Sequence, residues 1–356
     1  MKSRNRPGVF GSLSFAFSVF FVFTPEAMSQ SPTVGKSFDE IARSAAKEGR
    51  VRMASALQRD EEPLVLKGFY QKYPMIKVET ARISGSASRE RIFSEALGGL
   101  VEYDLVDISA EVQARFVKAG IVAGPFEWRR LFPNVQPLHF SPDGHFAAAG
   151  FSTHIIVYNP ALVPPERVPR RWEDCLDPYW KGKFVVDTRP KTFAGLALEW
   201  GEKKTLEYVT RLKENNPIWK RGQTEALTHL AAGEHPMLCG SYYQSTHRII
   251  RRDPKAKLAM SLPRELPSSM GETLAILKGA KSPNAALLLA GWLASAEGQR
   301  GYDEVGRGSP FVEGGEKWKL MQKAGAKIVF RGWEDNESEE AITKKIIAAW
   351  GFTGKM

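Results

Sequence analysis

The sequence predicts an α/β protein of two lobes, each built around a mainly parallel β-sheet. Its 356 residues are 43% hydrophobic and 25% charged, which is ordinary globular composition and enough for a large core or two lobes. Segments with strand patterning alternate with helices of about ten residues, as in βαβ units. This alternation occurs twice, and a stretch rich in turns and prolines separates the two series.

Residues 1–29 are expected to be a cleaved secretory signal peptide. Lys2, Arg4 and Arg6 precede an apolar run, and small residues at alternate positions then end at Ser29. A membrane anchor is the competing interpretation, but the run is shorter than the roughly 20 residues that span a bilayer and is interrupted by glycine and serine. We therefore expect an exported, soluble, periplasmic protein.

The first series begins at residue 37. Ser37 and Glu40 form a capping box, and Ile41 and Ala45 lie on one face of the helix that follows. The predicted elements are a helix over 37–49, a strand over 50–57, a helix over 61–73, a strand over 75–83, a helix over 88–100, a strand over 103–109 and a helix over 111–120.

The second series follows an extended segment over 153–159 and a loop with proline and short helical turns over 163–183. Two segments, 145–158 and 263–278, are candidate crossovers between the lobes. The other predicted elements are a strand over 183–188, helices over 193–214 and 224–233, a strand over 236–241, a helix over 244–252, strands over 257–263 and 271–279, and a helix over 284–305.

The chain is basic, with a formal net charge of +10. Residues 1–29 carry three basic side chains and one acidic one, so the mature chain carries +8. This charge suits an anionic cargo or surface, although a generally basic proteome explains it equally well. The basic residues are scattered, with one short cluster over 247–257 and no stripe with interleaved aromatics, so no nucleic-acid partner is expected.

The two cysteines, Cys175 and Cys239, are expected to be free, buried thiols. Export would allow a disulfide between them. Both, however, lie in apolar sequence contexts, where small buried thiols are common.

The usual catalytic signatures do not occur in the sequence. There is no glycine-flanked serine elbow, HExxH, phosphate-binding GxxxxGK, CxxC or GxGxxG after a strand. The six histidines include no metal-binding pair on one helix face. The sequence therefore favours a binding protein over an enzyme.

Polar breaks follow the carboxyl ends of several predicted strands, where open α/β sheets bind ligands. Several precede helices, whose free N–H groups favour an anion. The serines and the threonine have an alternative role as ordinary helix caps. The candidate ligand-binding residues are Gln58, Ser84, Gly85, Ser86, Glu111, Thr192, Tyr242, Tyr243 and Gln244.

Tyr242 and Tyr243 raise a particular question, because neighbours on a strand face opposite ways. Both can serve one ligand only where the strand gives way to a turn. Otherwise they are aromatic packing beneath the cleft.

Several segments resemble blocks of the family 1 extracellular solute-binding proteins of bacterial ABC importers, especially the ferric-ion-binding branch. The segment 169–188, "PRRWEDCLDPYWKGKFVVDT", is similar to a W-x-D-L-x-D-P-x-W-K-G-K block of that family. Further blocks match in the right order over 84–88 with Glu95 beyond, 104–109, 230–237, 277–299 and 306–310. The resemblance covers nearly the whole mature chain.

This resemblance implies a two-lobe type 2 periplasmic binding protein fold, with a ligand cleft between lobes and two crossover hinge strands. The implied boundaries are a signal peptide over 1–29, a discontinuous first lobe over 30–150 plus 268–356, and a second lobe over 151–267. It also implies a monomer without enzymatic activity. Cargo that contacts both lobes would favour the closed form, which docks on a membrane permease.

The resemblance further implies that Tyr242 and Tyr243 ligate ferric iron as transported cargo, with Glu111 as an acidic ligand. Phenolate and carboxylate oxygens suit a hard trivalent cation. No other cofactor is expected. Many iron-binding relatives carry a histidine in the loop after the first strand, whereas this chain has none there; Gln58 or Asp60 are the candidates to replace it.

Other cargoes and roles stay open at this stage. Family members also carry small organic anions, phosphorylated compounds or polyamines. Arg82, Arg89 and Arg189 would favour an anion, unless they are solvated surface charges. A receptor that signals to a membrane sensor, or an exported enzyme that uses Glu111 and a histidine as acid and base, are the alternatives.

Overall fold

The computed structural model describes residues 34–352, and the predicted signal peptide lies outside them. The side chains of Glu111 and Asn336 are likewise outside the description. Among the described residues, no helix is long and apolar enough to cross a membrane.

The first series forms the strands and helices that the sequence predicts up to residue 118, and the short helix α5 (Trp128–Leu131) after them is not predicted. Ser37 caps the first helix through its hydroxyl, which accepts a hydrogen bond from the Glu40 N–H, as the capping box requires. The elements are α1 (Phe38–Glu48), β1 (Arg50–Ser55), α2 (Glu62–Lys72), β2 (Lys77–Arg82), α3 (Gly85–Leu97), β3 (Leu105–Asp107), α4 (Gln113–Lys118) and α5 (Trp128–Leu131).

The rest of the chain begins with a long strand that crosses into a second group of strands. The elements are β4 (Phe146–Tyr158), β5 (Val185–Asp187), α6 (Lys191–Glu214), β6 (Ile218–Lys220), α7 (Gln223–Ala232), β7 (Met237–Tyr242), α8 (Tyr243–Arg252), β8 (Ala259–Ser261) and β9 (Glu265–Ile276). They are followed by α9 (Pro283–Ala294), α10 (Ala296–Glu304), α11 (Glu316–Ala324), β10 (Lys327–Arg331) and α12 (Asn336–Trp350).

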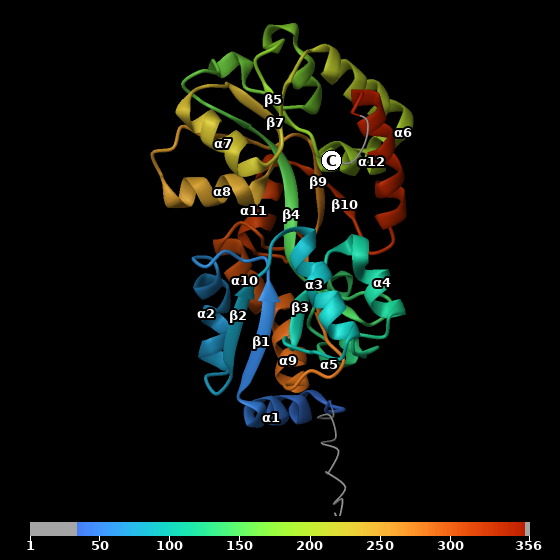
Figure 1. The fold of residues 1–356 in the computed structure, drawn as a ribbon. Helices are drawn as coiled ribbons and strands as arrows, with labels where there is room; N and C mark the ends of the chain where they lie inside the picture. The colour runs from blue at the N-terminus through green and yellow to red at the C-terminus, as the bar shows by residue number, and fades with distance from the viewer. Residues whose placement is uncertain (1–33, 353–356) are drawn as a thin grey trace, which may run out of the picture. The chain divides into compact units, whose positions relative to one another are not determined.

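The strands have the order β2-β1-β3-β9-β4-β7-β5-β6, with β10 beside β9 and β8 beside β4. Pairing is parallel within β2-β1-β3 and within β7-β5-β6. The strands β4 and β9 pair antiparallel with each other and connect the two groups (Figure 1). These are the two predicted crossovers, 145–158 and 263–278, and the two-lobe fold is confirmed.

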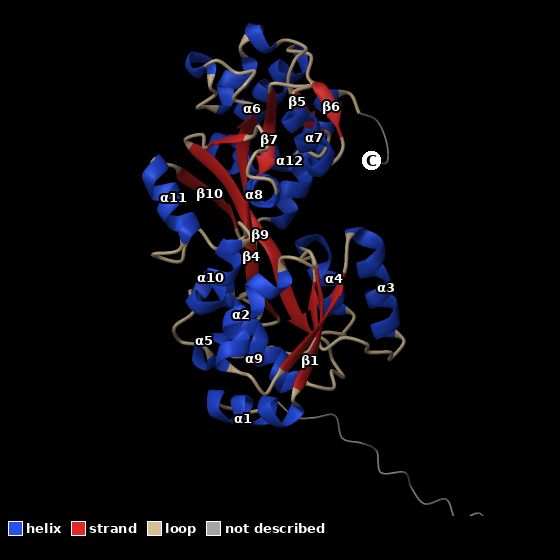
Figure 2. Cartoon of the chain, turned by 90° about the vertical axis from the view of Figure 1, so that its left-hand side faces the viewer, coloured by secondary structure: helices blue, strands red, loops and turns tan. Residues whose placement is uncertain are grey.

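Each group of strands has its own hydrophobic core. In the first lobe, α9 is buried along its whole length against β1, β4 and β9, and it is the most apolar helix in the described chain. In Figure 2, α9, α2 and α10 lie on one side of the β1 group, and α3 and α4 lie on the other.

The position of the C-terminal helix differs from the prediction, which placed residues 268–356 in the first lobe. Helix α12 packs on α6, and its Ile342, Ile346 and Trp350 are part of the core formed by Trp172 and Tyr208 of the second lobe. The Trp350 indole N–H donates to the Val209 carbonyl at 3.2 Å. The apolar spacing of α12 shows only that one face is buried, and the side chains it meets are distant in sequence.

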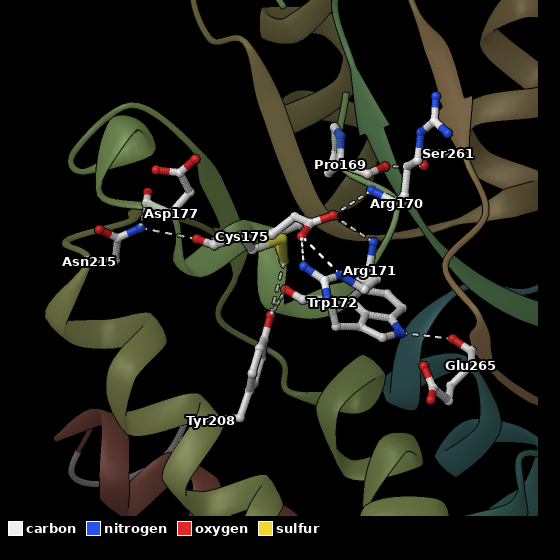
Figure 3. The surroundings of a disulfide bond; sticks show 12 residues. Pro169, Arg170, Arg171, Trp172, Cys175, Asp177, Tyr208, Asn215, Ser261 and Glu265 are labelled. Carbon is white, nitrogen blue, oxygen red and sulfur yellow. Dashed lines mark hydrogen bonds and ion pairs between the residues drawn. A yellow bond between two sulfur atoms is a disulfide. The ribbon is translucent and has the colours of Figure 1, made fainter. Parts of the chain in front are cut away.

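The prediction of free thiols is wrong, because Cys175 and Cys239 form a disulfide. Both are fully buried and join the turn over Trp172–Leu176 to strand β7. The Tyr208 hydroxyl donates to the Trp172 carbonyl at 2.7 Å and lies 3.7 Å from the Cys239 sulfur (Figure 3). An apolar context suits a buried disulfide as well as a buried thiol, so sequence context alone cannot separate them.

Candidate functional site

Tyr242 lies at the junction where β7 ends and α8 begins, so the strand gives way to a turn of helix at the tyrosine pair. It is half-buried and has extended backbone angles (φ −73°, ψ 129°). Its side chain lines a cavity of about 160 Å³ together with residues of the crossover strands β4 and β9. The ring centroid lies 4.4 Å from that of His154 on β4.

His154 connects this cavity to the start of α6. Its Nδ1 atom lies 2.7 Å from the Thr192 hydroxyl, and both residues are buried. Burial, with smaller effects from the charges of Lys191 and Arg331, lowers the pKa of His154 to about 3, so the imidazole is neutral at neutral pH. Thr192 contacts the hinge strand β4 and lines neither this cavity nor the larger one that adjoins it, and its role in ligand binding stays a prediction.

Gly240 allows this close approach of β7 to α6. Its φ is +97°, a conformation that L side chains rarely adopt, and a Cβ there would lie 2.8 Å from the Thr192 Oγ1 atom. Gly240 lies where the pairing of β4 with β7 shifts register, because Ile155 pairs with Ser241 and Ile156 with Cys239.

Gln244, the second residue of α8, lines the same cavity. It is 6% exposed, and its Nε2 atom lies 2.8 Å from the Ser152 hydroxyl of β4. Its Oε1 atom is buried and has no hydrogen-bond partner among the described residues.

Tyr243 occupies different surroundings from Tyr242. Its ring stacks on His247 with centroids 5.8 Å apart, and the Lys317 ammonium lies 5.5 Å from the ring centre. Burial, with the nearby Asp303 carboxylate, raises its pKa to about 12. Tyr243 does not line the Tyr242 cavity, so this structure does not place the two phenols together. Ligation by the pair stays a prediction.

A second cavity of about 720 Å³ adjoins the first, because Ala110, Lys191 and Glu339 line both. First-lobe residues such as Gln113 and Asp143 form one wall. The other walls of this cavity are formed by the segment from β5 to α6, by Arg221 and by acidic residues of α12. The sequence does not predict Arg221 or α12 as part of the site, because neither β6, which Arg221 directly follows, nor β10, which precedes α12, is among the predicted strands.

The predicted cationic residues are largely paired with carboxylates. The Arg189 guanidinium donates to Asp187 at 2.5 Å, and the Gln223 amide also donates to Asp187 at 2.8 Å. Arg89 donates to Asp107 at 2.9 Å. Arg189 still lines the larger cavity, whereas Arg82 is exposed.

Four predicted residues of the first lobe, Gln58, Ser84, Gly85 and Ser86, do not line the Tyr242 cavity. Ser84, Gly85 and Ser86 are exposed at the start of α3, and the Ser84 side chain caps no helix N–H. Gln58 is half-buried in the turn before α2, and its carbonyl accepts from the Glu61 N–H. Glu111 lies in the turn over Ala110–Val112, directly after the cavity-lining Ala110.

Asp60, the other candidate for the missing histidine, forms ion pairs instead. Its carboxylate accepts from Arg251 at 2.7 Å and from Arg252 at 2.5 Å, both on α8. These bonds hold its pKa well below the usual range. No cluster of three or more His, Cys, Asp or Glu side chains with metal-binding spacing occurs over the part of the chain that the structure describes.

Two lobes joined by a pair of crossing strands, with cavities lined from both lobes, define a two-lobe periplasmic binding protein. Comparison with known proteins agrees. Residues 54–300 match the family model of the bacterial extracellular solute-binding proteins, and the chain belongs to this family.

The match to an individual curated relative has low sequence identity and covers only part of the chain. The iron uptake protein A1 of Synechocystis is 25% identical over 139 residues, which is 37% of this chain and 38% of that relative. The chain's match thus spans well under half the length of this curated relative.

Solved structures share the fold at low sequence identity. An ABC transporter substrate-binding protein from Bradyrhizobium japonicum gives a TM-score of 0.67 at 16% identity, with 85% of this chain and 99% of that chain covered. The Trichodesmium protein IdiA (FutA), solved with iron and citrate, gives 0.66 at 19% identity, with 86% and 100% covered.

Proposed function

We propose that the chain is the periplasmic substrate-binding component of an ABC importer, which captures ferric iron or a small anionic solute and delivers it to a membrane permease. The observation that carries this proposal is the cavity at Tyr242, which the crossover strands, α8 and the start of α6 line together. Cargo held there contacts the hinge and both lobes, so binding favours one lobe arrangement over others.

Iron is supported by the name of the Synechocystis relative and by the Tyr242 phenol, an oxygen donor of the kind that ferric iron prefers. An anion is supported by Lys191 and Arg331, which line the same cavity. An anionic chelator that carries ferric iron would satisfy both.

We propose that the protein is a monomer that binds cargo without catalysing a reaction and has no nucleic-acid partner. A binder saturates with cargo without forming product, whereas an exported enzyme would turn candidate substrates over. The proposed partner is a permease; co-purification with a membrane sensor instead would favour the signalling alternative.

The test is a titration of the metal-stripped mature protein with ferric citrate, followed by the visible charge-transfer band of an iron-bound phenolate. Iron displaces the phenolic proton on binding, so a tyrosine with a pKa near 10 can ligate at neutral pH. We expect a band that saturates at about one iron per protein and disappears in Tyr242→Phe.

Tyr243→Phe should keep most of the band, because the Tyr243 ring packs on His247 outside the cavity. Tyr179→Phe, at an exposed tyrosine, is the matched control. Absence of a band in the wild type would exclude iron on tyrosine, and thermal shifts with small anions would then test the anionic cargo.

A further inference from the structure

We propose that the cavity at Tyr242 is a carboxylate subsite in which Gln244 is the specificity-determining residue. The inference rests on the proposed function and names the cargo class more closely: a small organic acid, free or as the chelator of a ferric ion.

The starting observation is the Gln244 amide. Its Oε1 atom is buried without a hydrogen-bond partner in the described chain, and the residue is 94% buried against a cavity wall. An unpaired buried polar group is destabilising, so such groups are uncommon in folded proteins. A ligand group in the cavity would remove this destabilisation.

The position of the amide is fixed from β4. Gln244 bonds to the Ser152 hydroxyl, and that hydroxyl is held close to β9: a Cβ at Gly271 would lie 2.6 Å from it. A hydroxyl can donate as well as accept, and the two ends of an amide are assigned only from their partners. The amide can therefore present either its oxygen or its N–H groups to the cavity.

The charged side chains on the cavity wall favour one of these two orientations of the Gln244 amide. Lys191 and Arg331 line the cavity, and the neighbouring His154 is buried and uncharged. The acidic residue on the wall, Glu339, forms an ion pair with Arg331. A negatively charged group is thus favoured, and the amide would turn its N–H toward it.

Size and charge together favour a carboxylate. The cavity volume of about 160 Å³ equals about five waters at 30 Å³ each, which admits a carboxylate with one or two further carbons. The charged side chains on the wall are the cations Lys191 and Arg331 and the carboxylate of Glu339, and this balance suits a single negative charge better than a phosphate dianion. The rest of the cargo would extend into the adjoining cavity of about 720 Å³.

The test uses calorimetry on the mature protein, purified without citrate or metal, with malonate, citrate, malonamide and inorganic phosphate as probes. Malonamide has the shape of malonate without its charge. We expect malonate or citrate to bind at least about tenfold more tightly than malonamide and phosphate, a difference of about 1.4 kcal/mol.

Gln244→Leu keeps the side-chain volume but removes the amide, and should weaken carboxylate binding about tenfold or more. Gln244→Glu should weaken it further through like-charge repulsion. Gln322→Leu, at an exposed glutamine of α11, is the matched control. Unfolding midpoints of all variants establish that they are folded.

The subsite proposal is overturned if wild type binds malonamide or phosphate as tightly as the carboxylates, if it binds none of the probes, or if Gln244→Leu binds carboxylates like wild type. These results leave the proposed function standing if ferric iron still binds at Tyr242. The proposed function fails separately, if neither iron nor any anion binds.

Discussion

The Arg248 guanidinium on α8 lies 2.6 Å from the carboxylate of Glu61, which is fully buried at the start of α2. Helix α8 belongs to the second lobe and α2 to the first, so this ion pair bridges the lobes beside the hinge. The Arg307 guanidinium lies 3.8 Å from the other Glu61 oxygen. The Arg248–Glu61 ion pair and the ion pairs of Asp60 together connect the loop after β1 to α8, the helix that carries Gln244.

Breaking this pair should destabilise the protein. Arg248→Met leaves the buried Glu61 carboxylate with only the Gln58 N–H at 3.1 Å and the Arg307 guanidinium at 3.8 Å, and we expect a loss of about 3 kcal/mol in the free energy of unfolding. A double-mutant cycle built from Arg248→Met and Glu61→Gln should give a coupling energy above about 1 kcal/mol, measured by urea denaturation.

The exposed pair of Glu316 and Lys319 on α11 gives the control for this cycle. Lys319→Met should change stability by no more than about 1 kcal/mol. Additive effects of Arg248→Met and Glu61→Gln would show that the two side chains do not interact in solution.

The disulfide should contribute strongly to stability. It joins residues 64 apart in sequence, and loop-closure entropy for that length corresponds to about 4 kcal/mol. We expect the Cys175→Ala, Cys239→Ala double variant to unfold at markedly lower urea concentration than wild type. Thiol titration of unreduced, denatured wild type should find no free thiol; two free thiols would refute the bond.

His139 predicts a pH dependence of stability. It is fully buried, with Nδ1 2.7 Å from the Ala294 carbonyl and Nε2 3.0 Å from the Ser309 hydroxyl. Burial lowers its pKa to about 4 from an ordinary value of 6.5. Between those values the unfolded chain binds a proton that the folded chain does not, so stability falls as pH falls from 6.5 to 4.

Wild type should therefore lose about 2 kcal/mol between pH 7 and pH 5 through this residue. His139→Gln should remove that part of the pH dependence, whatever its effect at pH 7. Urea denaturation at both pH values measures it, and His145→Gln, at a half-buried histidine, is the control. Equal pH dependence in wild type and His139→Gln would contradict the expectation.

Packing of α12 on the second lobe can be tested at Trp350. This side chain is 3% exposed and packs edge-on against Phe193 and at a tilt against Trp219. Trp350→Ala should lower the free energy of unfolding by about 3–5 kcal/mol. Leu100→Ala, at a leucine that is 63% exposed, should have little effect; a similarly small effect of Trp350→Ala would place α12 elsewhere.

The fold was largely predictable because its signals are local. Alternating apolar spacing and the capping box at Ser37 depend on neighbours a few residues away, and both predicted crossovers appear as β4 and β9. The absence of catalytic motifs and the block over 169–188 are also readable from the chain alone. They led to the solute-binding family that residues 54–300 match.

The sequence by itself determined the two α/β series, the strand ends that carry polar residues and the position of Tyr242 at one of them. Only the tertiary structure decided that Tyr242 and Tyr243 enter different surroundings, that Asp60 pairs with arginines and that Cys175 bonds Cys239. The physical reason is distance along the chain. Spacing fixes which residues leave a strand or helix together, whereas the partners that each side chain meets come from segments dozens to hundreds of residues away.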